Sequence, residues 1–174
     1  MSPDSELEKM SISFKTALLG ALALGVVCAR HGMGQADSSF AALQERGKMA
    51  MGVDQYTSAH RFDVLPSGGR IALETEQNDS LAIAQIRAHM RLIQHAFQAG
   101  DFSTPAFVHM RAMPGTEVMS RRRALIAYTY GDLPRGGEVR IASSDPESLA
   151  AIRKFLRAQG TDHRVERHGH SKDN

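Results

Sequence analysis

The amino-acid sequence predicts an α+β domain of two layers, in which helices cover one face of a four-stranded, mostly antiparallel sheet. The first observation is a phrase written twice, LPSGGRIAL at 65–73 and LPRGGEVRIA at 133–142. Alternating apolar and polar residues flank both copies, which predicts two β-hairpins. A stretch with the apolar spacing of a helix follows each hairpin. The chain therefore contains a ββα unit twice, at 59–99 and at 124–160.

The repeated phrase is typical of turn chemistry. Pro66 and Pro134 set the backbone angle φ at the entrance of each turn, and the glycine pairs that follow can adopt positive φ at little steric cost. A phosphate-binding role for the glycines is the weaker interpretation, because no helix begins directly after them as phosphate loops require.

The first predicted helix of the repeat begins at Asp79 or Ser80, which can cap it, runs through Gln98 and ends at Gly100. One face of this helix is apolar and is formed by Ile83, Ile86, Met90, Ile93 and Phe97.

In the second copy, Asp145 caps a helix that Pro146 opens and Gly160 closes. Its apolar face is formed by Leu149, Ile152, Phe155 and Leu156. One ββα unit cannot bury its own apolar face, whereas two units can share one sheet with both helices on the same side. The sequence leaves open whether the two halves pair within one chain or across a homodimer.

Two segments lie outside the repeat. An N-terminal helix is expected at 38–51, capped by Ser38 or Ser39 and ended by Gly52. The insert at 101–123 contains two prolines, so we expect a loop with one short helix after Thr116.

The N-terminus predicts export. Residues 17–27 form an uncharged apolar run that follows Lys9 and Lys15, as in a signal peptide. The run is shorter than the roughly twenty residues of a membrane-spanning helix. We expect a signal peptide at 1–36, cleaved after Ala36 or, as a second choice, after Ala29, with translation starting at Met1 or Met10.

The exported chain is then a single domain at 37–163 with a polar, disordered tail at 164–174. It has no membrane span, so its predicted location is the periplasm or the exterior of the cell. The lone cysteine, Cys28, would be removed with the signal peptide, which excludes disulfides, Cys-type zinc sites and iron–sulfur clusters. The 21 Lys and Arg nearly balance the 19 Asp and Glu, which gives no reason to expect a nucleic acid as partner.

The insert carries the residue types that suit copper. One imidazole and three thioethers lie between positions 109 and 119, and this combination favours Cu(I) in particular. Two more histidines approach the insert if the halves pack about a pseudo-twofold axis. The predicted metal site therefore consists of His109 with some of His60, Met110, Met113, Met119 and His163. The alternative interpretation is that the methionines fill the core and the histidines make structural hydrogen bonds.

We therefore expect a non-enzymatic periplasmic binding protein, with a metal ion or an envelope protein as its partner and copper as the specific ligand. One alternative is a protein-interaction or envelope accessory module without metal. Another is a small hydrolase or transferase that uses His109 or His60. The enzyme class has less support, because the chain lacks a G-x-S-x-G elbow, a dinucleotide fingerprint and a Walker loop.

The phrases MGVDQYTSAHRFDVLPSGGRIAL, GDFSTPAFVH, MPGTEVM and LPRGGEVRIA carry a resemblance. The exported part of the chain resembles a group of small exported bacterial proteins of unknown function, some of which bear the label aspartate carbamoyltransferase. That enzyme's catalytic chain carries an S-T-R-T phosphate motif, and its regulatory chain carries a cysteine-bound zinc; this sequence has neither. The resemblance therefore implies export and a shared fold, and it supplies no catalytic residue.

Overall fold

A computed structural model describes residues 27–52, 54 and 56–164, with side chains from residue 38 onward. The chain divides into two compact units, Met1–Ser38 and Ser39–Asn174. Of the first unit, the described part is helical backbone that begins at Val27. The second unit contains the sheet, the remaining helices and the site.

Helix α1 spans Val27–Met51 and therefore begins earlier than the helix predicted at 38–51. Its backbone runs through both predicted cleavage positions, Ala29 and Ala36. It ends where the sequence predicted, at Gly52, whose φ of 73° is readily adopted by glycine. The apolar run of the predicted signal peptide and the predicted tail lie outside the described residues, apart from Val27 and Arg164.

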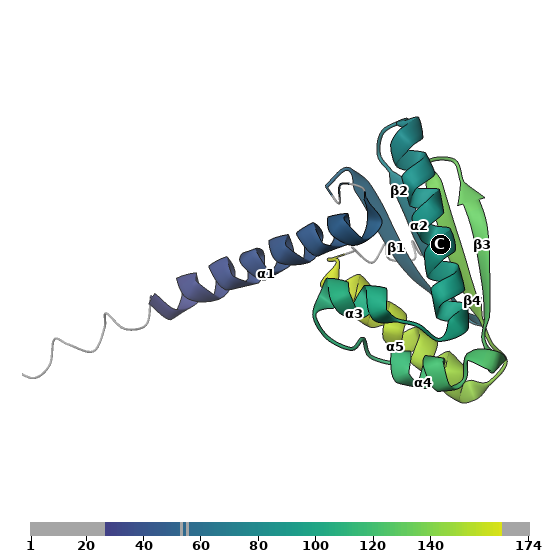
Figure 1. Cartoon of the computed structure of the whole chain (residues 1–174). Helices are drawn as coiled ribbons and strands as arrows, with labels where there is room; N and C mark the ends of the chain where they lie inside the picture. The colour runs from purple at the N-terminus through teal and green to yellow at the C-terminus, as the bar shows by residue number, and fades with distance from the viewer. Residues whose placement is uncertain (1–26, 53, 55, 165–174) are drawn as a thin grey trace, which may run out of the picture. The chain divides into compact units, whose positions relative to one another are not determined.

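The sheet has four strands, all antiparallel, in the order β1-β2-β4-β3. They are β1 (Ser58–Leu65), β2 (Gly68–Thr75), β3 (Ala127–Leu133) and β4 (Gly136–Ala142). Helices α2 (Ser80–Ala99) and α5 (Pro146–Asp162) pack on one face of this sheet (Figure 1). The predicted two-layer α+β fold with four antiparallel strands and an N-terminal helix is confirmed.

The two halves pair within one chain about a pseudo-twofold axis. Ile71 and Val139 occupy the same position in the two copies of the repeated phrase, and they are paired with each other across β2 and β4. The neighbouring pairs, Arg70 with Arg140 and Ala72 with Glu138, exchange places under the same symmetry. Helix α2 contacts mainly the strands of the second half, whereas α5 contacts those of the first, so the halves are interlocked.

Two glycines of the repeated phrase permit this close pairing. A Cβ added at Gly136 would lie 1.9 Å from the carbonyl oxygen of Leu73, and one at Gly68 would lie 2.1 Å from that of Ile141. Their role therefore includes strand approach as well as the turn geometry that the sequence predicted.

The predicted caps of α2 and α5 are present. The Asp79 side chain accepts hydrogen bonds from the backbone N–H groups of Leu81 and Ala82, and Gly100 ends α2 in the left-handed conformation. Asp145 caps α5 by accepting from the N–H of Ser148. Helix α5 continues past Gly160 to Asp162, so the prediction that Gly160 closes it was wrong.

The insert contains more helix than the sequence predicted. A short α4 (Thr116–Arg121) is present where it was expected, and a further helix, α3 (Ser103–His109), precedes it. A 3-10 turn at Arg123–Leu125 then leads into β3. Pro105 did not prevent α3, because it lies in the first turn, where its missing N–H has no helical partner to lose.

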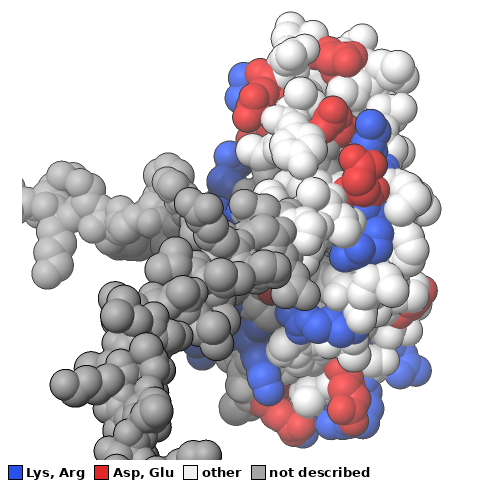
Figure 2. Space-filling model, turned by 90° about the vertical axis from the view of Figure 1, so that its left-hand side faces the viewer, with Lys and Arg blue, Asp and Glu red and all other residues white. Residues whose placement is uncertain are grey.

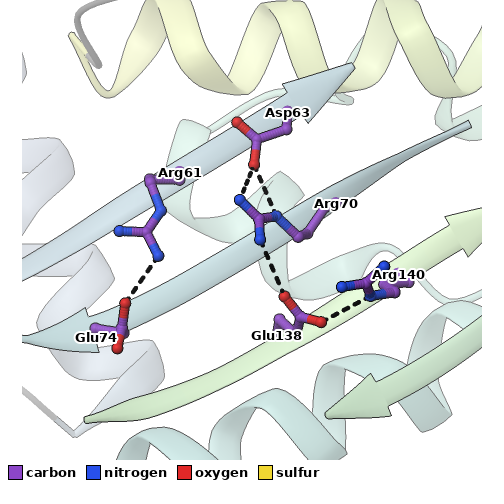
Figure 3. A network of polar contacts seen from close by, with 6 residues as sticks. All are labelled: Arg61, Asp63, Arg70, Glu74, Glu138 and Arg140. Carbon is purple, nitrogen blue, oxygen red and sulfur yellow. Dashed lines mark hydrogen bonds and ion pairs between the residues drawn. The ribbon is translucent and has the colours of Figure 1, made fainter. Parts of the chain in front are cut away.

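The sheet face away from the helices carries a network of paired charges (Figure 3). Its members are Arg61, Asp63, Arg70, Glu74, Glu138 and Arg140. Every one of the six has an oppositely charged partner in the network.

Among the described residues, no helix is long and apolar enough to cross a membrane.

Candidate functional site: a pocket lined by histidines

A pocket lies among α1, β1, α2, α3 and α5, on the helix-covered side of the sheet. Its volume is about 70 Å³, which is room for several water molecules or one small ligand. Four imidazoles line it, those of His60, His89, His109 and His163, together with the thioethers of Met51 and Met90. The other lining residues are mainly apolar, and they include Phe62, Ile93, Phe97 and Phe155.

The fold brings these histidines together from four separate elements. In β1, alternation directs His60 and Phe62 toward the helices, while Arg61 points to the charged face. His109 is the last residue of α3, and His163 is the C-cap of α5. Because the pocket depends on the packing of the two halves, no local sequence motif predicts it.

Three of the predicted site residues converge. The ring centres of His60 and His163 are 4.9 Å apart, and those of His109 and His163 are 5.2 Å apart. His60 also stacks on Phe62, with ring centres 5.6 Å apart and an interplanar angle of 3°. The approach of these histidines, which the sequence predicted on the assumption of pseudo-twofold packing, is present in the structure.

His109 is engaged by the protein at both ring nitrogens. Its Nε2 lies 2.8 Å from Oε1 of Gln159, and its Nδ1 lies 2.8 Å from Oδ2 of Asp162 in a direction that does not suit a hydrogen bond. The same Asp162 oxygen accepts from Arg111 at 2.5 Å. The imidazole is 1% exposed, so it ties α3 to α5 from a buried position.

His60 and His163 differ from His109 in the contacts of their ring nitrogens. Within the described part of the chain, neither ring makes a hydrogen bond through its nitrogens. His89 has a backbone hydrogen bond with Ala50 of α1. Two imidazoles of the pocket therefore keep nitrogen atoms available for a ligand.

Burial holds all four imidazoles in the neutral form at pH 7. Desolvation lowers the pKa of His89 to about 4, with the Ala50 hydrogen bond opposing the shift. Desolvation, with repulsion from His109, also lowers the pKa of His163 to about 4, while Asp162 opposes this shift. The pKa of His60 lies well below its usual value because of burial and the neighbouring histidines, and burial lowers the pKa of His109. Neutral imidazole is the form that binds metals.

The methionines of the predicted site lie elsewhere. Met110 is 69% exposed in a left-handed conformation after α3, while Met113 and Met119 are buried in the hydrophobic core. None of the three lines this pocket. Of the thioethers that do line it, Met90 was predicted on the apolar face of a helix and Met51 at the end of the N-terminal helix. No local signal in the sequence separates them from ordinary core methionines.

Among the described residues, no group of three or more His, Cys, Asp or Glu side chains is arranged to hold a metal ion. A closed structural zinc site needs four such ligands in tetrahedral geometry. The described pocket thus offers imidazoles and thioethers without the ligand set that zinc requires.

One feature favours an enzyme. His109 lies beside the Asp162 carboxylate, a pairing of residue types found in general-base catalysis, and Thr104 lines the same pocket. However, the Nε2 of His109, which would take the proton, faces the Gln159 side chain instead of a hydroxyl. The arrangement therefore positions helices, and it does not activate a nucleophile.

The surface in Figure 2 shows Lys and Arg interspersed with Asp and Glu over the described residues of that face. Charges of opposite sign alternate there over short distances, as they do in the network on the sheet. Specific recognition of a polyanion would instead use a continuous basic stripe.

Comparison of the chain with protein-family models, with curated proteins and with solved structures gives no significant match. The comparisons therefore supply neither a family nor site residues, and the resemblance described above stays a prediction.

Proposed function

We propose that this chain is an exported, non-enzymatic binding protein that takes copper into the histidine-lined pocket. The observation that carries the proposal is the meeting of His60 and His163 in an apolar pocket that keeps them neutral, with no hydrogen-bond partner for their nitrogens among the described residues. Neutral imidazole is a good ligand for copper in either oxidation state. Export rests on the signal-peptide pattern at 17–27.

A binding function agrees with the chemistry of the site better than catalysis does. The Asp162 carboxylate beside His109 is paired with Arg111, and His109 itself is held by Gln159. A catalytic base needs a nitrogen within reach of the proton it removes. Binding needs only ring nitrogens such as those of His60 and His163, which have no hydrogen bond to any residue that the structure describes.

The test is copper titration of the full chain. His168 and His170 of the tail and the lone cysteine, Cys28, can bind copper adventitiously, so the histidines are first replaced by glutamine and the cysteine by serine. In this background we expect one copper per chain, and we expect His163→Ala to weaken its affinity at least tenfold. The matched control is His95→Ala, because His95 is exposed on α2 and does not line the pocket.

Two outcomes contradict the proposal. One is a folded His163→Ala variant, verified by circular dichroism, that binds copper as tightly as the parent chain. The other is a folded parent chain that binds neither Cu(I) nor Cu(II), which would direct the search to protein partners in the cell envelope.

A further inference from the structure

We infer that the pocket is selective for Cu(I) and that the sulfur of Met90 is a ligand beside the imidazoles of His60 and His163, with Met51 placed to supply a second sulfur. This inference rests on the proposed function and adds the oxidation state and the thioether ligands. The sequence had placed the sulfur ligands in the insert, at Met110, Met113 and Met119.

The two imidazoles are spaced for one ion. Metal–nitrogen bonds of about 2 Å place the ring centres of two imidazoles on the same ion about 5 to 6 Å apart. The observed separation of His60 and His163 is 4.9 Å. Their planes are tilted by 30°, and the His163 ring also packs against those of Phe62 and His109. His163 is the C-cap of α5, and its ring has no hydrogen bond to a described residue.

The thioethers come from two elements that face the pocket. Met90 lies on the buried face of α2, and Met51 is the last residue of α1. Both are buried, and both line the pocket with the histidines. A thioether is a soft, uncharged ligand that selects Cu(I) over Zn(II).

The charge of the pocket also favours a monovalent ion. The described lining residues include no aspartate or glutamate, so a bound cation would have no anionic ligand. The cost of placing an ion in an apolar environment rises with the square of its charge, and it is several kcal/mol even for a single charge. A site built from neutral imidazoles, thioethers and aromatic rings therefore penalises Cu(II) and Zn(II) more strongly than Cu(I).

The small number of imidazole ligands also favours Cu(I). Because no three His, Cys, Asp or Glu among the described residues can surround one ion, two imidazoles must be completed by a ligand of another kind. Of the other polar side chains that line the pocket, His89 has a hydrogen bond to Ala50, and His109 and Gln159 are hydrogen-bonded to each other. The soft ligands of the pocket are the thioethers of Met51 and Met90.

The experiment compares Met90→Leu, Met51→Leu and Met119→Leu in the full chain with His168 and His170 replaced by glutamine and Cys28 by serine, because a cysteine thiolate itself binds Cu(I). Leucine keeps the volume of methionine and removes the sulfur. Met119 is the control, since it is buried in the core and does not line the pocket. Cu(I) affinity is measured without oxygen against a competing chelator, Zn(II) is titrated in parallel, and X-ray absorption spectra of the Cu(I) forms report sulfur ligands.

We expect Cu(I) to bind at least a hundredfold more tightly than Zn(II). Met90→Leu should weaken Cu(I) binding at least tenfold and reduce the sulfur scattering, while Met119→Leu should do neither. Copper that needs His163 but shows only nitrogen ligands, with unchanged affinity in Met90→Leu and Met51→Leu, would overturn this inference and leave the proposed function in place. Equal affinity for Zn(II) would overturn the selectivity. A folded chain that binds no copper would overturn both proposals.

Discussion

Arg70 and Glu138 occupy the same position in the two copies of the repeated phrase, and their side chains form an ion pair across the pseudo-twofold axis, with Nη1 and Oε2 3.3 Å apart. Each also has a second partner, Asp63 for Arg70 and Arg140 for Glu138 (Figure 3). Symmetric pairing of two identical copies would bring like charges together at this point. The opposite charges therefore favour pairing of the first half with the second.

Glu138→Gln should lower the free energy of unfolding by about 1 to 3 kcal/mol, because the largely buried carboxylate accepts from two arginines that would lose a charged partner. Urea unfolding at pH 7 measures the change. Glu117→Gln is the control, since its ion pair with Arg121 is exposed and should contribute less than about 1 kcal/mol. Equal effects of the two substitutions would show that the network adds nothing specific.

Gly136→Ala should destabilise the domain by about 3 kcal/mol or more, because the new Cβ would overlap the Leu73 carbonyl in the β2–β4 pairing. Thermal unfolding followed by circular dichroism checks this. A variant with the stability of the parent chain would mean that β2 and β4 do not pair in this register.

Gly160→Ala should have the opposite effect. The position lies inside α5 with nothing closer to the new Cβ than Phe62 at 3.9 Å, and alanine favours a helix interior by about 1 kcal/mol over glycine. A small rise in the unfolding temperature is expected. A fall would indicate that α5 ends at Gly160, as the sequence alone suggested.

The metal-free protein should lose stability as the pH falls from about 6.5 to about 4. His89 and His163 have pKa values near 4 in the folded chain and near 6.5 when unfolded, so the unfolded chain binds more protons within this range. Each contributes at most about 3 kcal/mol, at about 1.4 kcal/mol per pKa unit. The stabilisation is complete above pH 6.5 and absent below pH 4.

Urea unfolding at a series of pH values tests this dependence, with His89→Gln expected to flatten it and His95→Gln expected to leave it unchanged. If the parent chain is equally stable at pH 5 and pH 7.5, the histidines are not shielded from solvent as the structure indicates.

His109→Ala should reduce stability by about 2 kcal/mol or more, because it removes the link between α3 and α5 and leaves Gln159 without its buried partner. The folded variant should still bind copper, since both ring nitrogens of His109 already face protein groups. Calorimetry of unfolding and copper titration separate the two effects. Lost copper affinity in a fully stable variant would instead make His109 a ligand.

The fold could be predicted from the sequence because the patterns that specify its elements are local. Apolar alternation, the repeated turn phrase and the caps at Asp79 and Asp145 each specify an element, and two equal units have few ways to share a sheet. Helix α3 was missed because its proline, Pro105, and its short length are typical of a loop. The end of α5 was placed too early because a glycine inside a helix looks the same in sequence as one that ends it.

Only part of the site could be predicted from the sequence. His60, His109 and His163 were chosen for their chemistry, and the packing brings them together. The methionines of the insert were chosen because they lie near His109 in sequence, yet the fold turns them into the core or toward solvent. Met90 looked like any core residue of an amphipathic helix, because whether a buried face borders a pocket depends on contacts distant in the chain.

Ile71 and Val139 are equivalent positions of the repeat and pair with each other, and this symmetry bears on how many ligands one molecule can hold. A symmetric assembly of identical units would carry every site in duplicate. Joined in a single polypeptide, the copies have been free to diverge: the counterpart of His60 is Tyr128, and that of Phe62 is Tyr130. Tyr128 packs against Phe97 in the core. The second copy therefore lacks the imidazole that His60 supplies to the described pocket, and the proposed function predicts one ligand per chain.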